Sequence, residues 1–210
     1  MTRFALFFGL ALVALAQPAV AQGRSSQPDS TLVRDETSRL AVAVLGRVCL
    51  LNLGDIGGVL AATAQGGEYG FVEPPAEVAE PLLQGRSGYV RVLRRSGLGA
   101  VTVVATNDGI CSVWSEFADA GALIRHMIAM VDRGGLKDGA KYLPLDTHDE
   151  GGTTVTDSYL MPVGWYAAQL GKRFGDDGTK PLALVLTVSA PGKRPMEAVL
   201  TVSRKITKPQ

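Results

Sequence analysis

The amino-acid sequence predicts an α+β fold: an antiparallel sheet made of two strand groups, with an amphipathic helix between the groups and N-terminal helices packed on the sheet. Three observations predict this class. Short valine-rich segments occupy the middle of the chain, one long helical pattern follows them, and two C-terminal segments share the sequence VLTVS at 185–189 and 199–203. Strands and helices do not alternate regularly, which argues against a parallel doubly wound sheet, and we expect the helices mainly on one face.

The first 21 residues have the pattern of a secretory signal peptide. Arg3 precedes an uncharged apolar run over residues 4–16, and Ala19-Val20-Ala21 offers the small-x-small motif of a cleavage site. An uncleaved anchor is the alternative, but 13 apolar residues fall short of the roughly 20 that a membrane-spanning helix needs. We therefore expect residues 1–21 to be removed, with no transmembrane segment later in the chain, and the protein to be periplasmic or secreted.

Polar residues 22–33 lack periodicity and predict a flexible tether before a single α+β domain over residues 34–205. The first expected helix covers 34–51, with Leu40, Val44 and Val48 on one face. A second covers 55–65, with Asp55 as its N-cap, and a turn or two of helix follows at 76–83.

The middle of the chain changes to the pattern of short strands. We expect three of them in an antiparallel meander, with tight turns at 96–99 and 107–109, and the strands at 89–95, 100–106 and 110–116. The clearest helix of the chain follows at 119–133, because apolar residues recur there at i, i+3, i+4 and i+7 until Gly134-Gly135.

The last third of the chain adds further short elements and a second hairpin. The elements are expected at 141–145, 153–161, 165–173, 181–189 and 196–204. Residues 190–195, rich in proline and glycine, form the turn between the last two strands, and residues 206–210 form a basic C-terminal tail.

The two cysteines are expected to form a disulfide. Cys49 and Cys111 are the only pair, and the oxidising compartment that an exported protein reaches favours joining them. Two buried free thiols are the alternative. A bridge would join the first helix to the third strand.

Charge limits the kinds of partner. The formal net charge is +1, and the basic C-terminal stretch has no interleaved aromatic residues, so we expect no nucleic-acid partner. Five of the six charged side chains in residues 191–210 are basic: Lys193, Arg194, Arg204, Lys205 and Lys208. This end could contact lipid headgroups, cell-wall polymers or an acidic partner, or it is simply a solvated tail.

Chemistry-bearing residues gather at one place, Asp146-Thr147-His148-Asp149-Glu150. An imidazole among carboxylates could hold a divalent ion or act as a general base, whereas a solvated hairpin turn ending in Gly151-Gly152 is the alternative. His126 lies off the apolar face of its helix and is expected at the surface. Because no nucleophile elbow or phosphate-binding loop is present, no catalytic, cofactor-binding or metal-binding residue and no cofactor is assigned.

Four aromatic residues could form a ligand platform if they share one face of the sheet: Trp114, Tyr159, Trp165 and Tyr166. Ordinary packing in the core is the alternative.

Four short motifs together resemble a group of small exported proteins of alphaproteobacteria without an assigned activity. They are VCLLN around Cys49, the segment 70–75, CSVW at 111–114 and AVLTVS at 198–203. The resemblance implies export, paired cysteines and one domain, and it implies no site residue.

The sequence therefore predicts a soluble exported domain without catalytic activity that binds an envelope protein, glycan or lipid headgroup. The alternatives are a metal-assisted hydrolase that uses the cluster at 146–150, and a purely structural component of the envelope.

Overall fold

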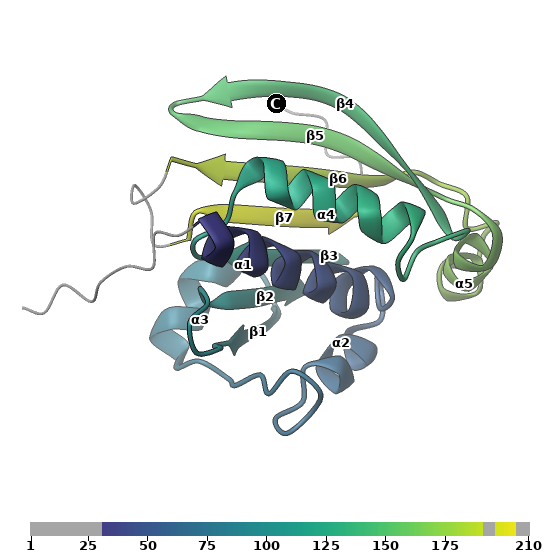
Figure 1. Cartoon of the computed structure of the whole chain (residues 1–210). Helices are drawn as coiled ribbons and strands as arrows, with labels where there is room; N and C mark the ends of the chain where they lie inside the picture. Colours follow the sequence, from purple (N-terminus) through teal and green to yellow (C-terminus); the bar gives the residue numbers. More distant parts are fainter. Residues whose placement is uncertain (1–30, 191–195, 205–210) are drawn as a thin grey trace, which may run out of the picture.

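Seven antiparallel strands form one sheet in the computed structural model, which describes residues 31–190 and 196–204 (Figure 1). The order across the sheet is β1-β2-β3-β7-β6-β5-β4. The strands are β1 (Gly88–Leu93), β2 (Val101–Thr106), β3 (Ile110–Ser115), β4 (Ala140–Glu150), β5 (Thr153–Pro162), β6 (Leu182–Ser189) and β7 (Ala198–Ser203). The expected α+β class, meander and C-terminal hairpin are confirmed.

The C-terminal strand joins the two predicted strand groups into one sheet. β7 pairs with β3 on one side, where Val113 lies opposite Leu200, and with β6 on the other. Its inward side chains are fully buried, because β7 lies in the interior of the sheet.

Two helices lie side by side across one face of this sheet (Figure 1). They are α1 (Thr31–Val44), which continues as one π-helical segment, η1 (Leu45–Leu50), and α4 (Ala120–Asp132). The apolar residues that alternate along the strands point toward these helices and form the core. Those at the centre of the sheet are Val101, Val103, Val113, Leu184, Leu186, Leu200 and Val202.

Three shorter helices complete the fold. α2 (Ile56–Ala62) begins at the expected cap, where Asp55 accepts a hydrogen bond of 2.9 Å from the backbone N–H of Gly58. α3 (Ala76–Leu83) packs against β1 and β2, and α5 (Gly164–Phe174) follows β5.

The expected disulfide is formed. Cys49 in η1 and Cys111 in β3 are bonded, and their Cα atoms are 5.5 Å apart. Both side chains are buried in the core, so the bridge ties the first helix to the middle of the sheet.

Some boundaries differ from those expected. α1 begins at Thr31, inside the expected tether, and ends as a π-helix. Residues 146–150 belong to β4 and not to a hairpin turn, because β4 resumes its pairing with β5 after an irregularity between Pro144 and Asp146. The turn is Gly151-Gly152, where both residues have positive φ. The expected signal peptide (1–21), the turn at 191–195 and the tail at 206–210 lie outside the described residues.

Candidate functional site

A groove of about 320 Å³ lies between α1–η1 and α4, on the outer side of these helices. Apolar residues and glycines form most of its walls, and the polar side chains among them are two arginines and one histidine. The lining residues are Arg39, Val42, Ala43, Gly46, Arg47, Leu51, His126, Ala129, Met130, Gly134, Gly135 and Leu136. An apolar hollow with a few convergent polar groups is typical of a small-molecule site, although its volume is near the lower end of the range of roughly 300–1,000 Å³.

Small residues on both helices make the groove. Ala43 and Gly46 face it from α1 and η1, and Ala129 faces it from α4. The helices approach closely at Gly46, because a Cβ atom there would lie 2.6 Å from the sulfur of Met130. Met130 thus lies against bare backbone and forms part of the groove wall.

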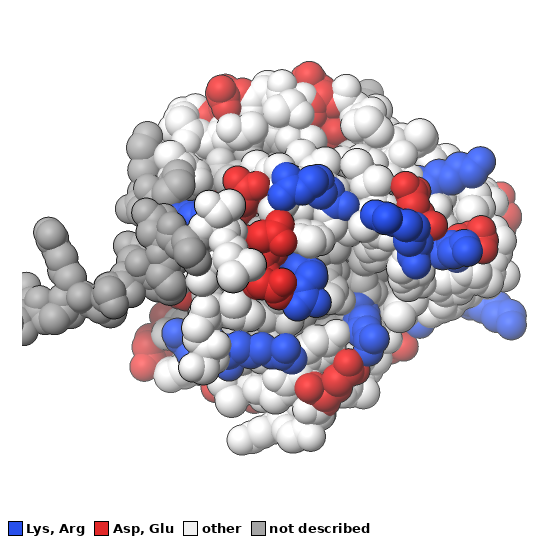
Figure 2. Space-filling view, viewed as in Figure 1, with Lys and Arg blue, Asp and Glu red and all other residues white. Residues whose placement is uncertain are grey.

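The two arginines each hold an exposed carboxylate outside the groove. Arg39 donates from Nε to Glu36 across 3.0 Å, and this hydrogen bond raises the pKa of the guanidinium. Arg47 donates from Nη1 to both carboxylate oxygens of Glu68, at 2.7 and 2.9 Å. Figure 2 shows acidic and basic side chains interspersed over this face of the molecule. Exposed ion pairs of this kind contribute only about 0–1 kcal/mol, so another anion can replace the carboxylate at little cost.

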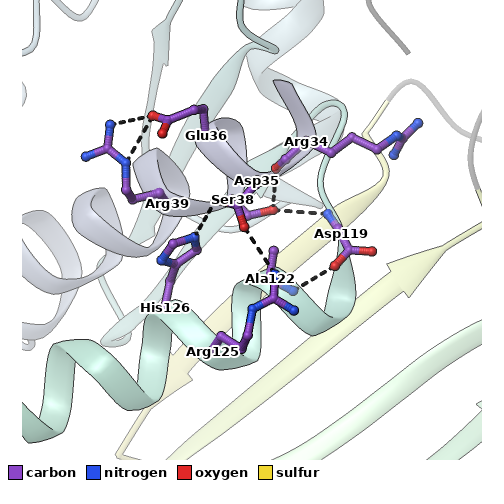
Figure 3. Close-up of polar contacts among 9 residues, drawn as sticks. All are labelled: Arg34, Asp35, Glu36, Ser38, Arg39, Asp119, Ala122, Arg125 and His126. Atoms are coloured by element: carbon purple, nitrogen blue, oxygen red, sulfur yellow. Dashed lines mark hydrogen bonds and ion pairs between the residues drawn. The ribbon is translucent and has the colours of Figure 1, made fainter. Parts of the chain in front are cut away.

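His126 is half-buried at the contact between the two helices, and not fully at the surface as expected (Figure 3). Its Nε2 lies 3.3 Å from Oδ2 of Asp35, whose other carboxylate oxygen accepts a hydrogen bond of 3.1 Å from Arg125. The helical pattern of α4 placed His126 off the apolar face correctly, but only the position of α1 decides what covers it.

A short chain of hydrogen bonds fixes the start of α4 on α1. Ser38 donates to the carbonyl of Arg34 across 2.7 Å, and its oxygen accepts from the backbone N–H of Asp119 at 3.0 Å. The Asp119 carboxylate then accepts from the N–H of Ala122 at 2.7 Å and caps α4 (Figure 3).

The end of η1 is held by side chains of α5. The buried hydroxyl of Tyr166 donates to the carbonyl of Leu50 across 2.7 Å, and burial raises the pKa of this phenol. Gln169 and Arg173 donate to the carbonyl of Leu51 at 2.9 and 3.0 Å. Because the last carbonyls of a helix lack partners within it, these donors stabilise the wall that carries Arg47.

The acidic cluster at 146–150 lies along an edge strand. His148 has one ring nitrogen 3.7 Å from Asp146 and the other 3.3 Å from Glu150, while Asp149 accepts a hydrogen bond from Thr154. The part of the chain that the structure describes contains no group of three or more His, Cys, Asp or Glu side chains arranged to hold a metal ion. Charged side chains on an edge strand such as β4 hinder pairing with another chain.

The four aromatic residues do not form one platform. Trp114 and Tyr159 lie on strands β3 and β5, and both point to the face opposite α1 and α4. Trp165 and Tyr166 lie on α5, where their ring centroids are 5.5 Å apart.

One residue of the basic C-terminal stretch, Arg204, is fixed by neighbouring side chains. Its guanidinium lies 4.1 Å above the centre of the Phe174 ring and donates to both carboxylate oxygens of Asp176. The hydrogen bond from Arg204 is the main reason that the pKa of Asp176 falls to about 2. Arg204 is therefore part of the fold and not of a solvated tail.

Within residues 31–190 and 196–204, no helix is both long and apolar enough to cross a membrane. Comparisons with protein-family models, curated protein sequences and solved structures found no match for this chain.

Proposed function

We propose that the protein is an exported, non-catalytic domain that binds a molecule of the cell envelope in the groove between α1–η1 and α4. The observation that carries the proposal is the lining of this groove, in which apolar walls meet two arginines and a histidine without any acidic residue. Such a lining offers buried apolar contact together with orienting polar groups, which are the two requirements of a ligand site.

Export is supported by the predicted signal peptide and by the disulfide. A bridge between Cys49 and Cys111 persists in an oxidising compartment such as the periplasm, and it joins η1, which carries part of the groove wall, to β3. The resemblance to exported proteins with paired cysteines agrees with this location.

Binding without catalysis is supported by the geometry of the two histidines. His126 faces a carboxylate through one ring nitrogen and His148 through both, but neither has a described serine, threonine or cysteine nucleophile within hydrogen-bonding distance. The groove itself is lined by no hydroxyl or thiol group. We therefore propose ligand binding and not hydrolysis.

The test is to recover the full chain from the envelope extract of cells that express it and to identify bound small molecules by native mass spectrometry. The substitution Ala129→Leu fills the groove, whereas Ala61→Leu makes the same change at an exposed position on α2. We expect the unaltered protein and the Ala61→Leu control to retain one molecule that Ala129→Leu loses. Recovery without any bound molecule, or equal retention by both variants, would refute the proposal.

A further inference from the structure

The two arginines of the groove lie at different levels along its length. The pairs Asp35–His126 and Gly46–Met130 show that α1–η1 and α4 run in the same direction. Arg39 therefore lies toward the end near His126. Arg47 lies eight residues later, about 12 Å along a regular helix, toward the end where Leu136 lines the groove.

The wall between the arginines is aliphatic. Val42, Met130 and Leu136 contribute branched or thioether side chains, and the smaller residues leave room beside them. The groove has no aromatic side chain on which a planar ring could stack, and no hydroxyl or amide side chain to recognise a sugar. A flexible methylene chain matches such a wall, because its recognition needs only apolar area.

The arginines provide the charge that a matching ligand must carry. Each guanidinium already binds a carboxylate, from Glu36 or Glu68, whose side chains are 37% and 64% exposed and do not line the groove. A carboxylate on the ligand would form the same kind of hydrogen bonds while releasing the glutamate to water. This exchange costs little for an exposed pair, and Arg–carboxylate geometry is favourable.

We infer that the ligand of this groove is an aliphatic chain that ends in a carboxylate, with the chain over Met130 and the carboxylate on Arg39 or Arg47. This inference rests on the proposed function and specifies the chemistry of its ligand. A neutral lipid would not use the charge of the two arginines, a sugar would not use the aliphatic wall, and a cationic ligand would be repelled by the arginines.

The experiment uses decanoate, below its micelle concentration, as the probe. The protein is expressed from the full chain and purified after export. Binding is measured by calorimetry, and the site is located from the shifts of backbone amide signals. Decanol tests the need for the charge, and butyrate tests the need for the chain. The variants are the double substitution Arg39→Gln/Arg47→Gln, the groove-filling Ala43→Leu, and the controls Arg94→Gln and Ala61→Leu, both at exposed positions outside the groove.

We expect saturable binding of decanoate, with amide shifts centred on α1, η1 and α4. The double arginine variant should bind at least about tenfold more weakly, because it loses charge-assisted hydrogen bonds, and Ala43→Leu should bind more weakly still. Decanol and butyrate should each bind more weakly than decanoate, and both controls should bind like the unaltered protein. Circular dichroism verifies that each variant is folded.

Three results would overturn the inference: no saturable shift at the groove, equal binding of decanoate and decanol, or unchanged affinity in the double arginine variant. If a molecule from the envelope is retained in the groove but decanoate is not, the ligand class is wrong and the proposed function stands. If neither is retained, both are wrong.

Discussion

Single side chains decide how the first helix is attached to the rest of the molecule. Tyr166, far away in the sequence, donates to a carbonyl at the end of η1, and Ser38 connects α1 to the start of α4. A well-buried ionic contact joins Arg34 in α1 to Glu197 just before β7, whose atoms Nη1 and Oε2 are 2.6 Å apart. The Glu197 side chain is only 3% exposed and that of Arg34 is 14% exposed.

Substitution of Arg34 should destabilise the protein strongly. The substitution Arg34→Met removes the guanidinium from a buried carboxylate and from the carbonyl of Ala118, which accepts from it at 3.1 Å. Breaking a buried pair in this way costs about 3–5 kcal/mol of the free energy of unfolding, measured by urea denaturation. Arg94→Met, at an exposed position, should change it by less than about 0.5 kcal/mol. A similar small change for Arg34→Met would show that the pair contributes little.

At the scale of elements, the π-helical segment η1 combines several roles. It carries Gly46 and Arg47 of the groove and Cys49 of the disulfide, and α5 binds its last carbonyls. π-helical turns are rare and occur frequently at functional sites. Within this segment, Cys49 is bonded to β3 while Arg47 is exposed.

Removal of the disulfide should lower the stability of the folded protein. The bridge closes a loop across 62 positions, and the variant Cys49→Ala/Cys111→Ala loses this restriction of the unfolded chain. We expect the free energy of unfolding to fall by about 2–4 kcal/mol in urea titrations. The unaltered protein under reducing conditions should approach the same value. Equal denaturation midpoints with and without the bridge would contradict this expectation.

At the scale of the whole molecule, β7 joins two strand groups into one sheet. Strands β1–β3 and strands β4–β6 do not pair with each other directly, and β7 lies between the two groups, paired with β3 and with β6. Because β7 is the last strand among the described residues, this sheet is completed only when that segment is in place.

The two tryptophans lie on opposite sides of this junction, with Trp114 in β3 and Trp165 in α5. We expect the variants Trp114→Phe and Trp165→Phe, each with one remaining fluorophore, to unfold in a single transition. Within each variant, fluorescence and far-ultraviolet circular dichroism should give the same midpoint in urea. Separate midpoints for the two signals would mean that the strand groups unfold independently.

The local pattern of the sequence was sufficient to predict the class of the fold, the positions of most helices and strands, and the disulfide. Asp55 and Asp119 each cap a helix by accepting a hydrogen bond from the backbone three residues later, so these caps depend only on neighbouring residues. The tight turn at 107–109 between two valine-rich strands is likewise a feature of the local sequence. The extension of β4 through 146–150 was not visible, because the polar residues there lack the apolar alternation of a strand and pair with β5 through hydrogen bonds of the hairpin.

The groove was decided by the tertiary structure alone. Arg39, Arg47 and His126 have no motif or spacing in common, and they meet because the sheet holds α1 and α4 side by side with small residues between them. A sequence pattern records the contacts that each element needs, such as caps, apolar faces and turns. It does not record which two faces of different helices leave a space between them, because that depends on the packing of both against a third surface.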